Sequence, residues 1–273
     1  MRGASRDALN DVLASFERGV GSAPDGAGAA DVSAGLYAVA ALLDREPSLR
    51  RAFTDPASAP DGRRELADAL LGQQLAPLPL GVFHELVAAR WGSAADLREA
   101  VEAVATSAAM RAAEADGSLD EVEDELFGFE RLLAREPALR SAFTDPGLPA
   151  ERKSALLRDL LGAQARPTTL SLLEIAVTRP RGGSLEAALE ELSRLAAQRR
   201  ARYLAHVRVA RPLEPVHQSR LAAALARIYR REVQLQVDVD PAVLGGVEVR
   251  VGDEVLDGTV ARSLGTVRRR LAG

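Results

Sequence analysis

The chain has 273 residues, long enough for two ordinary domains or three small ones, and its 47% hydrophobic and 27% charged residues are typical of a soluble, core-forming protein. Its formal net charge is −4, with 35 basic and 39 acidic residues mixed along the chain, which argues against a nucleic-acid-binding protein because such proteins usually carry a net basic domain or stripe. The absence of cysteine excludes disulfides, thiolate metal sites and cysteine nucleophiles, and the 4% of aromatic residues is too low for a base-stacking surface.

The first residues of the chain, 1–13, are polar and amphipathic and lack the apolar core of a signal peptide. In the first half of the chain, the longest apolar run without a charge covers residues 32–43, far short of the roughly 20 residues that a membrane-spanning helix needs. We therefore expect no direct membrane insertion, so that any link to a membrane runs through partner proteins. Residues 19–30, GVGSAPDGAGAA, have the composition of a flexible loop.

Two segments of the chain repeat one another at a constant offset of 90 residues (135 − 45 = 90). Residues 45–72 read REPSLRRAFTDPASAPDGRRELADALLG, residues 135–162 read REPALRSAFTDPGLPAERKSALLRDLLG, and 14 of the 28 aligned positions are identical. The match extends upstream, where Tyr37 corresponds to Phe127, and downstream beyond residue 162. Because a period of 90 residues is too long for a solenoid repeat, each copy is predicted to be a small domain.

Each copy is predicted to be a bundle of short helices. Apolar residues recur every three or four positions up to Pro47 in the first copy and Pro137 in the second, as in an amphipathic helix that proline then ends. After each proline we expect a short turn, then Thr-Asp-Pro, then a new helix from near Asp61 or Pro149. Two further helices are predicted in each copy from the apolar residues Leu80, Phe83, Val87, Leu97, Val101 and Val104, and Leu170, Leu173, Val177, Leu185, Leu189 and Leu192.

Beyond about residue 200 the apolar period changes from 3.6 to 2, which predicts strands. Three runs alternate apolar with polar residues, and they cover residues 203–209, 233–239 and 247–251. A helix between the first two runs is expected to bury one apolar face, formed by Leu221, Leu225 and Ile228.

The end of the chain carries hairpin and helix signals. Gly252-Asp253 suits a tight hairpin turn, and Asp257-Gly258 is expected to end the strand that follows it. A final helix is predicted from the apolar stripe formed by Val260, Leu264, Val267 and Leu271.

These patterns together predict a mainly α protein. Two tandem small helical bundles are followed by a small α+β module, in which two helices cover one face of a short sheet. The expected domains are a first bundle at 1–112, a second bundle at 113–200 and the C-terminal module at 201–273.

The segment VDVDPAVLGGVEVRVGDEVLDGTVARSLGTVRRRL, residues 237–271, resembles the C-terminal signature of the delta (oligomycin-sensitivity-conferring) subunit of F-type ATP synthases. That family shows a strand, Asp-Pro, an apolar pair, Gly-Gly, a strand, Gly-Asp and then Asp-Gly-Ser/Thr before a closing helix. The matching positions, in order, are Asp240, Pro241, Leu244, Gly245, Gly246, Gly252, Asp253, Asp257, Gly258 and Thr259. Residues 115–200 resemble the family's helical bundle, so the first 114 residues are covered only through the duplication.

The resemblance implies a peripheral-stalk (stator) subunit of a proton-translocating F-type ATP synthase. In this family the helical bundle binds the N-terminal helices of the alpha subunits and the C-terminal module meets the b-subunit stalk. The resemblance further implies a peripheral location at the cytoplasmic face of the cell membrane, through the complex, and a non-catalytic subunit without cofactors. The usual member has one helical bundle and this chain has two, which leaves open which copy binds alpha.

The glycine pairs of this signature admit a second interpretation, as phosphate or metal loops. A phosphate cradle needs a glycine-rich turn that leads into a helix N-terminus, whereas Gly245-Gly246 leads into an alternating strand, as a turn or bulge does. The nearby acidic residues lack the spacing of a calcium-binding loop. We therefore expect no metal site, and structural roles for Asp240, Pro241, Gly245, Gly246, Gly252, Asp253, Asp257 and Gly258.

No other group of polar residues favours catalytic chemistry. His84, His206 and His217 are widely separated and form neither a triad nor a metal-binding pattern. The arginine runs at 199–202 and 268–270 lie at predicted helix ends, where cations stabilise the helix dipole, and this interpretation is favoured over contacts with nucleic acid or lipid headgroups. A free helical adaptor that reuses the duplicated bundle is the alternative function, and the C-terminal signature argues against it.

Overall fold

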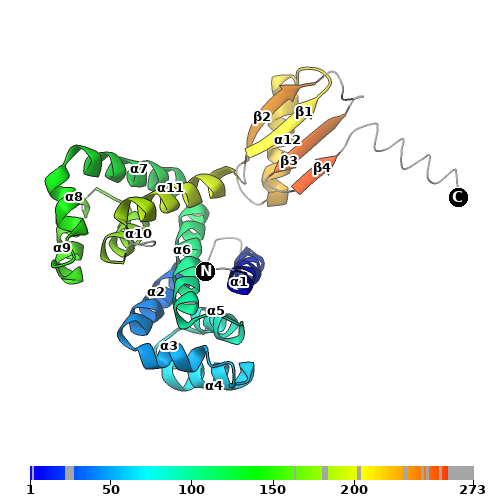
Figure 1. Ribbon diagram of the computed structural model, residues 1–273. Coiled ribbons are helices and arrows are strands. Elements are labelled where there is room, and N and C mark those ends of the chain that lie inside the picture. Colours follow the sequence, from blue (N-terminus) through cyan, green and yellow to red (C-terminus); the bar gives the residue numbers. More distant parts are fainter. Residues whose placement is uncertain are drawn as a thin grey trace, which may run out of the picture. The chain divides into compact units, whose positions relative to one another are not determined.

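The structure is a computed structural model that describes residues 1, 3–21, 28–162, 164–179, 184–201, 204–229, 233–240, 243, 246–251 and 254–257. The chain forms two compact units, Met1–Leu195 and Ala196–Gly273. The first unit is helical and the second combines a small sheet with a helix, so the predicted mainly α fold with a small α+β module is confirmed (Figure 1).

The helices of the first unit follow the predicted order, and the last of them continues into the second unit. They are α1 (Ala4–Gly21), α2 (Ala29–Arg45), α3 (Pro47–Phe53), α4 (Pro60–Leu71), α5 (Pro77–Ala88), α6 (Ala94–Ala115), α7 (Leu119–Arg135), α8 (Pro137–Thr144), α9 (Ala150–Leu161), α10 (Pro167–Thr178) and α11 (Leu185–Ala201). At the repeat offset of 90 residues, α2 to α5 of the first copy correspond to α7 to α10 of the second.

The segments after Pro47 and Pro137 differ from the prediction, because they are short helices, α3 and α8, instead of turns. Proline ends the preceding helix, yet its φ angle suits a first helical residue and its missing N–H has no partner to lose there. Thr54 and Thr144 stand at the ends of these helices, and each hydroxyl donates a hydrogen bond to a carbonyl four residues earlier. One residue, Glu46 or Glu136, therefore separates the two helices in each copy, and the proline begins the second helix.

Each copy is held by its own apolar core with one pair of aromatic rings. Phe53 packs edge-on against Phe83 in the first copy, with ring centroids 5.3 Å apart. Phe143 occupies the position of Phe53 in the second copy and packs against Phe129 at 5.7 Å. The second ring thus comes from α5 in one copy and from α7 in the other, where the corresponding positions carry smaller side chains. The two cores fill the same space with different residues, as cores tolerate when their volume is conserved.

Helix α6 belongs to both copies. It follows α5 as α11 follows α10, and it precedes α7 as α1 precedes α2. Thirteen of its 22 residues are buried, including residues on opposite faces, and it contacts α1, α2, α3 and α5 as well as α7 and α10. The expected boundary between residues 112 and 113 falls inside this helix, and the division into three domains stays a prediction.

The crossing of α2 with α5 and the corresponding crossing of α7 with α10 use different contacts. In the first copy, Gly35 of α2 lies so close to Pro79 of α5 that an added Cβ atom would meet the proline Cβ at 2.8 Å. In the second copy the corresponding residues are Glu125 and Thr169, and the carboxylate of Glu125 accepts hydrogen bonds from the Thr169 hydroxyl and the backbone N–H of Arg166. The carboxylate thereby satisfies the N-terminus of α10, an energetically favourable place for negative charge.

A buried arginine satisfies the C-terminus of α5. The Arg63 guanidinium donates hydrogen bonds to the carbonyls of Val87 at 2.6 Å, Ala88 at 2.9 Å and Ser58 at 2.7 Å. The corresponding residue of the second copy, Lys153, is also a buried cation. Both copies therefore keep a buried positive charge at the same position, where the last carbonyls of a helix need donors.

The second unit is a four-stranded sheet with one helix packed on it. Its elements are β1 (Leu204–Val209), α12 (Pro215–Tyr229), β2 (Gln234–Val239), β3 (Val247–Val251) and β4 (Glu254–Asp257). The strand order is β2-β1-β3-β4, with β1 parallel to β2 and antiparallel to β3. The chain passes from β1 to β2 through α12, which lies on one face of the sheet (Figure 1). Its Leu225 is buried together with Ala205 and Val207 of β1 and Val249 of β3.

The strand predictions are confirmed, whereas the burial expected from the apolar pattern is wrong for two side chains, Ile228 and Val239. Val251 pairs with Glu254 across the β3–β4 hairpin, whose two turn residues lie outside the described residues, as does the predicted final helix. Ile228, expected on the buried face of its helix, is 62% exposed in the last turn of α12. Val239 is 48% exposed because it ends an edge strand, which has a neighbour on one side only.

Substitution of Gly35 by alanine is expected to lower the free energy of unfolding by about 1–3 kcal/mol, since the added methyl group collides with Pro79. Gly128 of α7 is the matched control, because its Cβ would meet nothing within 4 Å. Gly128→Ala should leave stability unchanged or raise it by up to about 1 kcal/mol, the difference in helix propensity. Chemical unfolding followed by circular dichroism checks both, and equal stabilisation by the two substitutions would contradict the close crossing.

Replacement of Arg63 by methionine is expected to destabilise the helical unit by about 2–4 kcal/mol, because several buried carbonyls lose a charged donor. Arg64 is the matched control, an exposed neighbour that pairs with Asp61 on the surface of α4. Arg64→Met should change stability by less than about 0.5 kcal/mol. Thermal unfolding of the two variants measures the contrast, and similar losses would show that burial of Arg63 is unimportant.

Candidate interaction sites

The described residues form contacts between helices and a network of charged side chains at the C-terminal sheet. Within the described ranges, no group of three or more His, Asp or Glu side chains is arranged to hold a metal ion. In the same part of the chain, no helix combines the length and apolarity required to cross a membrane. Two sites have enough geometry to analyse in detail: the contact between the helical copies, and the region of the C-terminal signature.

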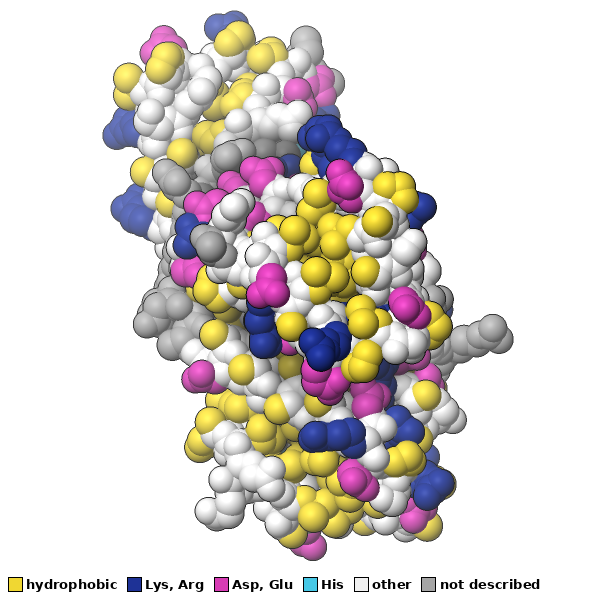
Figure 2. Space-filling view, turned by 90° about the vertical axis from the view of Figure 1, so that its left-hand side faces the viewer, with side chains coloured by type: hydrophobic (Ala, Val, Ile, Leu, Met, Phe, Trp, Pro, Cys, Tyr) yellow, Lys and Arg dark blue, Asp and Glu magenta, His cyan; other side chains and the backbone are white. Residues whose placement is uncertain are grey.

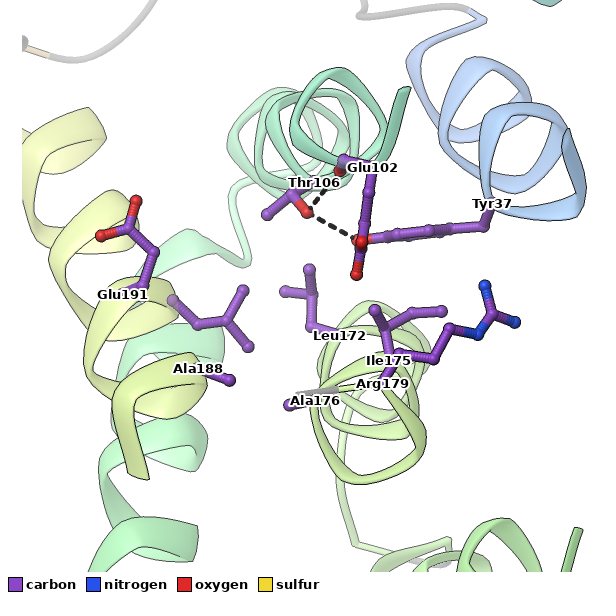
Figure 3. Close-up of a pocket in the computed structure, with 10 residues that line it drawn as sticks. Tyr37, Glu102, Thr106, Leu172, Ile175, Ala176, Arg179, Ala188 and Glu191 are labelled. Atoms are coloured by element: carbon purple, nitrogen blue, oxygen red, sulfur yellow. Dashed lines mark hydrogen bonds between the residues drawn. The ribbon is translucent and has the colours of Figure 1, made fainter. Parts of the chain in front are cut away.

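The contact between the copies centres on Tyr37 of α2 (Figure 3). Its hydroxyl lies 3.0 Å from the Thr106 hydroxyl on the shared helix α6, and Thr106 in turn donates to the carbonyl of Glu102 at 2.8 Å. The ring lies beside Ile175 and Arg179, which reach it from the α10 side (Figure 3). The first copy thus places an aromatic side chain of α2 against α10 of the second copy, with α6 beneath both.

An ion cluster closes the edge of this contact. The Asp44 carboxylate, at the end of α2, accepts a hydrogen bond from Nε of Arg98 on α6 at 2.8 Å. The same carboxylate lies 3.7 Å from Arg50 and 3.5 Å from Arg179 of the second copy. Arg98 also pairs with the buried Glu102 at 3.2 Å. The cluster therefore joins the first copy, the shared helix and the second copy through one carboxylate.

The charges around Arg98 keep it ionised. Burial lowers the pKa of Arg98, but the attraction of Glu102 and the hydrogen bond to Asp44 outweigh that effect and raise the pKa above its ordinary value.

The corresponding positions show that this contact is specific to the junction. Phe127 of α7 corresponds to Tyr37, and it is 54% exposed, with the Arg131 guanidinium 5.7 Å from the centre of its ring. Asp44 corresponds to Ala134, and Arg179 corresponds to Ala89. Neither the ion cluster nor the tyrosine hydroxyl is repeated within either bundle.

His84 and Arg199, two of the residues considered above as possible functional groups, both make contacts within the fold. His84 on α5 is 2.9 Å from Asp68 on α4, and the corresponding pair in the second copy is Glu174 with Arg158 at 2.7 Å, so the acidic residue moves from the first helix of the pair to the second. Arg199 lies in the last turn of α11, as expected from its place at a helix end, and it is buried.

Exposed apolar side chains mark further surface on the helical unit. One face of the molecule carries hydrophobic side chains in patches separated by charged groups (Figure 2). Leu70 of α4 and Leu160 of α9 occupy the same position in the two copies and are 38% and 37% exposed. Leu78 of α5 is also exposed. The sequence alone could not separate these residues from the core, because a docking groove and a helix core use the same residue types.

In the signature region, the backbone of Asp240 and Gly246 is described. Asp240 follows β2, where its N–H donates to the carbonyl of Val209 at 2.8 Å and its carbonyl accepts from Val243 at 3.1 Å. Its carboxylate pairs with Arg208, which also pairs with Glu248 at 3.1 Å. The hydrogen bond to Asp240 is the main cause that raises the pKa of Arg208.

Gly246 has a φ angle of +83°, a conformation that side chains other than glycine rarely adopt. Asp257 ends β4 opposite Glu248. The remaining predicted residues, Pro241, Gly245, Gly252, Asp253 and Gly258, lie outside the described residues, and the structural roles assigned to the signature stay predictions.

Gly246→Ala is expected to destabilise the sheet unit by about 1–2 kcal/mol, the cost of a side chain in the left-handed region. Gly246→Asn should lose less, because asparagine tolerates this conformation better. Ser219→Ala, on the exposed surface of α12, is the control and should change stability by less than about 0.5 kcal/mol. Hydrogen exchange of the β1 amides reports the unfolding of this unit. If the amides of Gly246→Ala were as protected as those of the control, the left-handed conformation of Gly246 would not contribute to stability.

Comparison with known proteins places the chain in a family. The family described as ATP synthase delta (OSCP) subunit matches residues 101–271. A protein of Streptomyces griseus, named ATP synthase subunit delta, is 49% identical over 245 residues, which cover 90% of each chain. Proteins of the same name from Parafrankia and Thermobifida fusca are 48% and 44% identical, and the matches cover 99% and 100% of both chains. These relatives span the first copy as well, so they share the chain length that includes two helical copies. The chain belongs to the ATP synthase delta (OSCP) subunit family.

Proposed function

We propose that this chain is the peripheral-stalk (stator) subunit of a proton-translocating F-type ATP synthase, and that it ties the catalytic alpha/beta head to the b-subunit stalk. The observation that carries the proposal is the full-length match to relatives named ATP synthase subunit delta, together with the signature at residues 237–271.

A stator has to resist torque without turning over a substrate. The rotor turns inside the head, and the head would follow it unless a tie connected it to the membrane-fixed stalk. Such a tie needs extensive contacts and slow dissociation, and nanomolar or tighter binding corresponds to about −12 kcal/mol or stronger. Helix-in-groove packing supplies contact of this kind, since an amphipathic helix buries a continuous apolar face.

The two units suit two different partners. The helical unit is proposed to bind the N-terminal helices of the alpha subunits, and the sheet unit to meet the b-subunit stalk. The chain would then lie at the cytoplasmic face of the cell membrane as a peripheral protein, held there by the complex. As a non-catalytic subunit, it is expected to hydrolyse no ATP when isolated.

A free helical adaptor is the weaker alternative. It would reuse the duplicated bundle for an unrelated partner and would have no need of the C-terminal signature. The match of the family description to residues 101–271, which includes that signature, favours the stator.

The proposed function is tested by titration of the purified chain onto a catalytic head that lacks its own delta subunit. Size-exclusion chromatography with mass analysis should show saturation at one chain per head, and binding should be lost when the N-terminal helices of alpha are removed. Circular dichroism must show the helical fold beforehand. A folded chain that does not bind the head would contradict the stator function and favour the adaptor.

A further inference from the structure

The two helical copies share one helix, and a second contact decides their relative orientation. Helix α6 runs without interruption from Ala94 to Ala115 and packs on helices of both copies. A shared helix alone leaves rotation of one bundle about it available. The contact of α2 with α10 is the additional constraint, and it consists of the Tyr37 ring beside Ile175 and the Asp44 ion cluster.

The two parts of this contact differ in specificity. The apolar part holds α2 near α10, but apolar contacts are non-directional and tolerate sliding. The ion pair between Asp44 and Arg179 joins one carboxylate to one guanidinium at 3.5 Å, with no hydrogen bond made by the Arg179 Nη1 atom to a described residue, and it connects residues that are 135 positions apart (179 − 44 = 135). Of the four ion pairs described for this cluster, it is the one that reaches the second copy outside the shared helix.

We propose that Asp44 and Arg179 form a salt-sensitive latch, which holds the two helical copies in one orientation about the shared helix α6. Release of the latch lets the bundles rotate relative to one another while each bundle stays folded. The latch concerns the isolated chain and does not rest on the proposed function.

Exposure and charge determine how the latch responds. The side chains of Asp44 and Arg179 are 30% and 25% exposed, whereas the Arg179 Nη1 atom of the pair is itself buried. Salt screens a partly buried pair less than an exposed one, and at about 1 M salt, where the screening length is about 3 Å, it weakens the attraction between the two groups. Arg98 keeps Asp44 positioned from the shared helix, which directs the carboxylate toward Arg179.

The chain offers a clean way to measure the orientation, because it contains no cysteine. Ala69→Cys and Asp159→Cys place labels on α4 and α9, at corresponding exposed positions of the two copies. Spin labels at these sites report the distance between the bundles by double electron–electron resonance. The wild-type background should give one narrow distance distribution at low salt and a distribution at least twice as wide at about 1 M salt.

Three variants and a control test the latch. Asp44→Ala and Arg179→Ala should each widen the low-salt distribution at least twofold and remove its salt dependence, whereas Asp44→Glu should keep it narrow. Both alanines are compatible with the bundle, since the corresponding positions carry Ala134 and Ala89. Arg194→Ala, which removes an exposed ion pair within α11, is the control and should change nothing.

Three outcomes would overturn the proposal. One is a distribution that stays narrow in Arg179→Ala with unchanged helicity, even if Asp44→Ala widens it, because Asp44 would then act within the first copy alone. Another is a wild-type distribution already broad at low salt. The third is a salt response that persists in both alanine variants.

Discussion

Burial of α6 on opposite faces is the constraint on which the helical unit depends. An ordinary amphipathic helix buries one stripe and exposes the other. Helix α6 buries thirteen of its 22 residues and serves as the last helix of one bundle and the first of the next. Its many alanines let helices approach closely on both sides, and its buried polar residues find partners, as Arg111 does with Glu114 at 3.2 Å. The two copies therefore share one helix and lie within one compact unit.

The duplication shows which features of the bundle are required and which are interchangeable. Proline at the start of α3 and α8 and a buried cation in α4 and α9 occur in both copies. Other contacts use different residues in the two copies. The glycine–proline crossing of the first copy is a carboxylate cap in the second, and the histidine–aspartate contact of α4 and α5 is an arginine–glutamate pair in α9 and α10. Each of these helix contacts needs two complementary residues, and different pairs of residues meet that need in the two copies.

Much of this architecture was predictable from the sequence because its signals are local. Prolines and the 3.6-residue apolar period place the helices, and strict alternation places the strands. The sequence around Pro47 and Pro137 does not distinguish a turn from a short helix, because proline both ends a helix and suits the first position of the next one. The exposure of Ile228 is not predictable from periodicity, because periodicity identifies the apolar face of a helix and does not show where the packed surface ends.

The remaining features depend on contacts between distant residues. An internal repeat indicates two domains, and nothing in it shows that a single helix is shared between them. The Asp44 cluster joins residues as far apart as 135 positions, and Asp44 has an alanine at the corresponding position, so the repeat gave no hint of it. A family resemblance identifies the residues of the signature, whereas the backbone hydrogen bonds of Asp240 and the positive φ of Gly246 are known only from the structure.

The stator function requires that the chain couple ATP hydrolysis to proton transport without taking part in the chemistry. The most direct measurement is ATP-driven proton pumping by synthase that has been depleted of this subunit and reconstituted in vesicles. Addition of the chain should restore pumping, because the head is again held against the rotor. Unchanged pumping, with the chain folded and bound to the complex, would contradict the account.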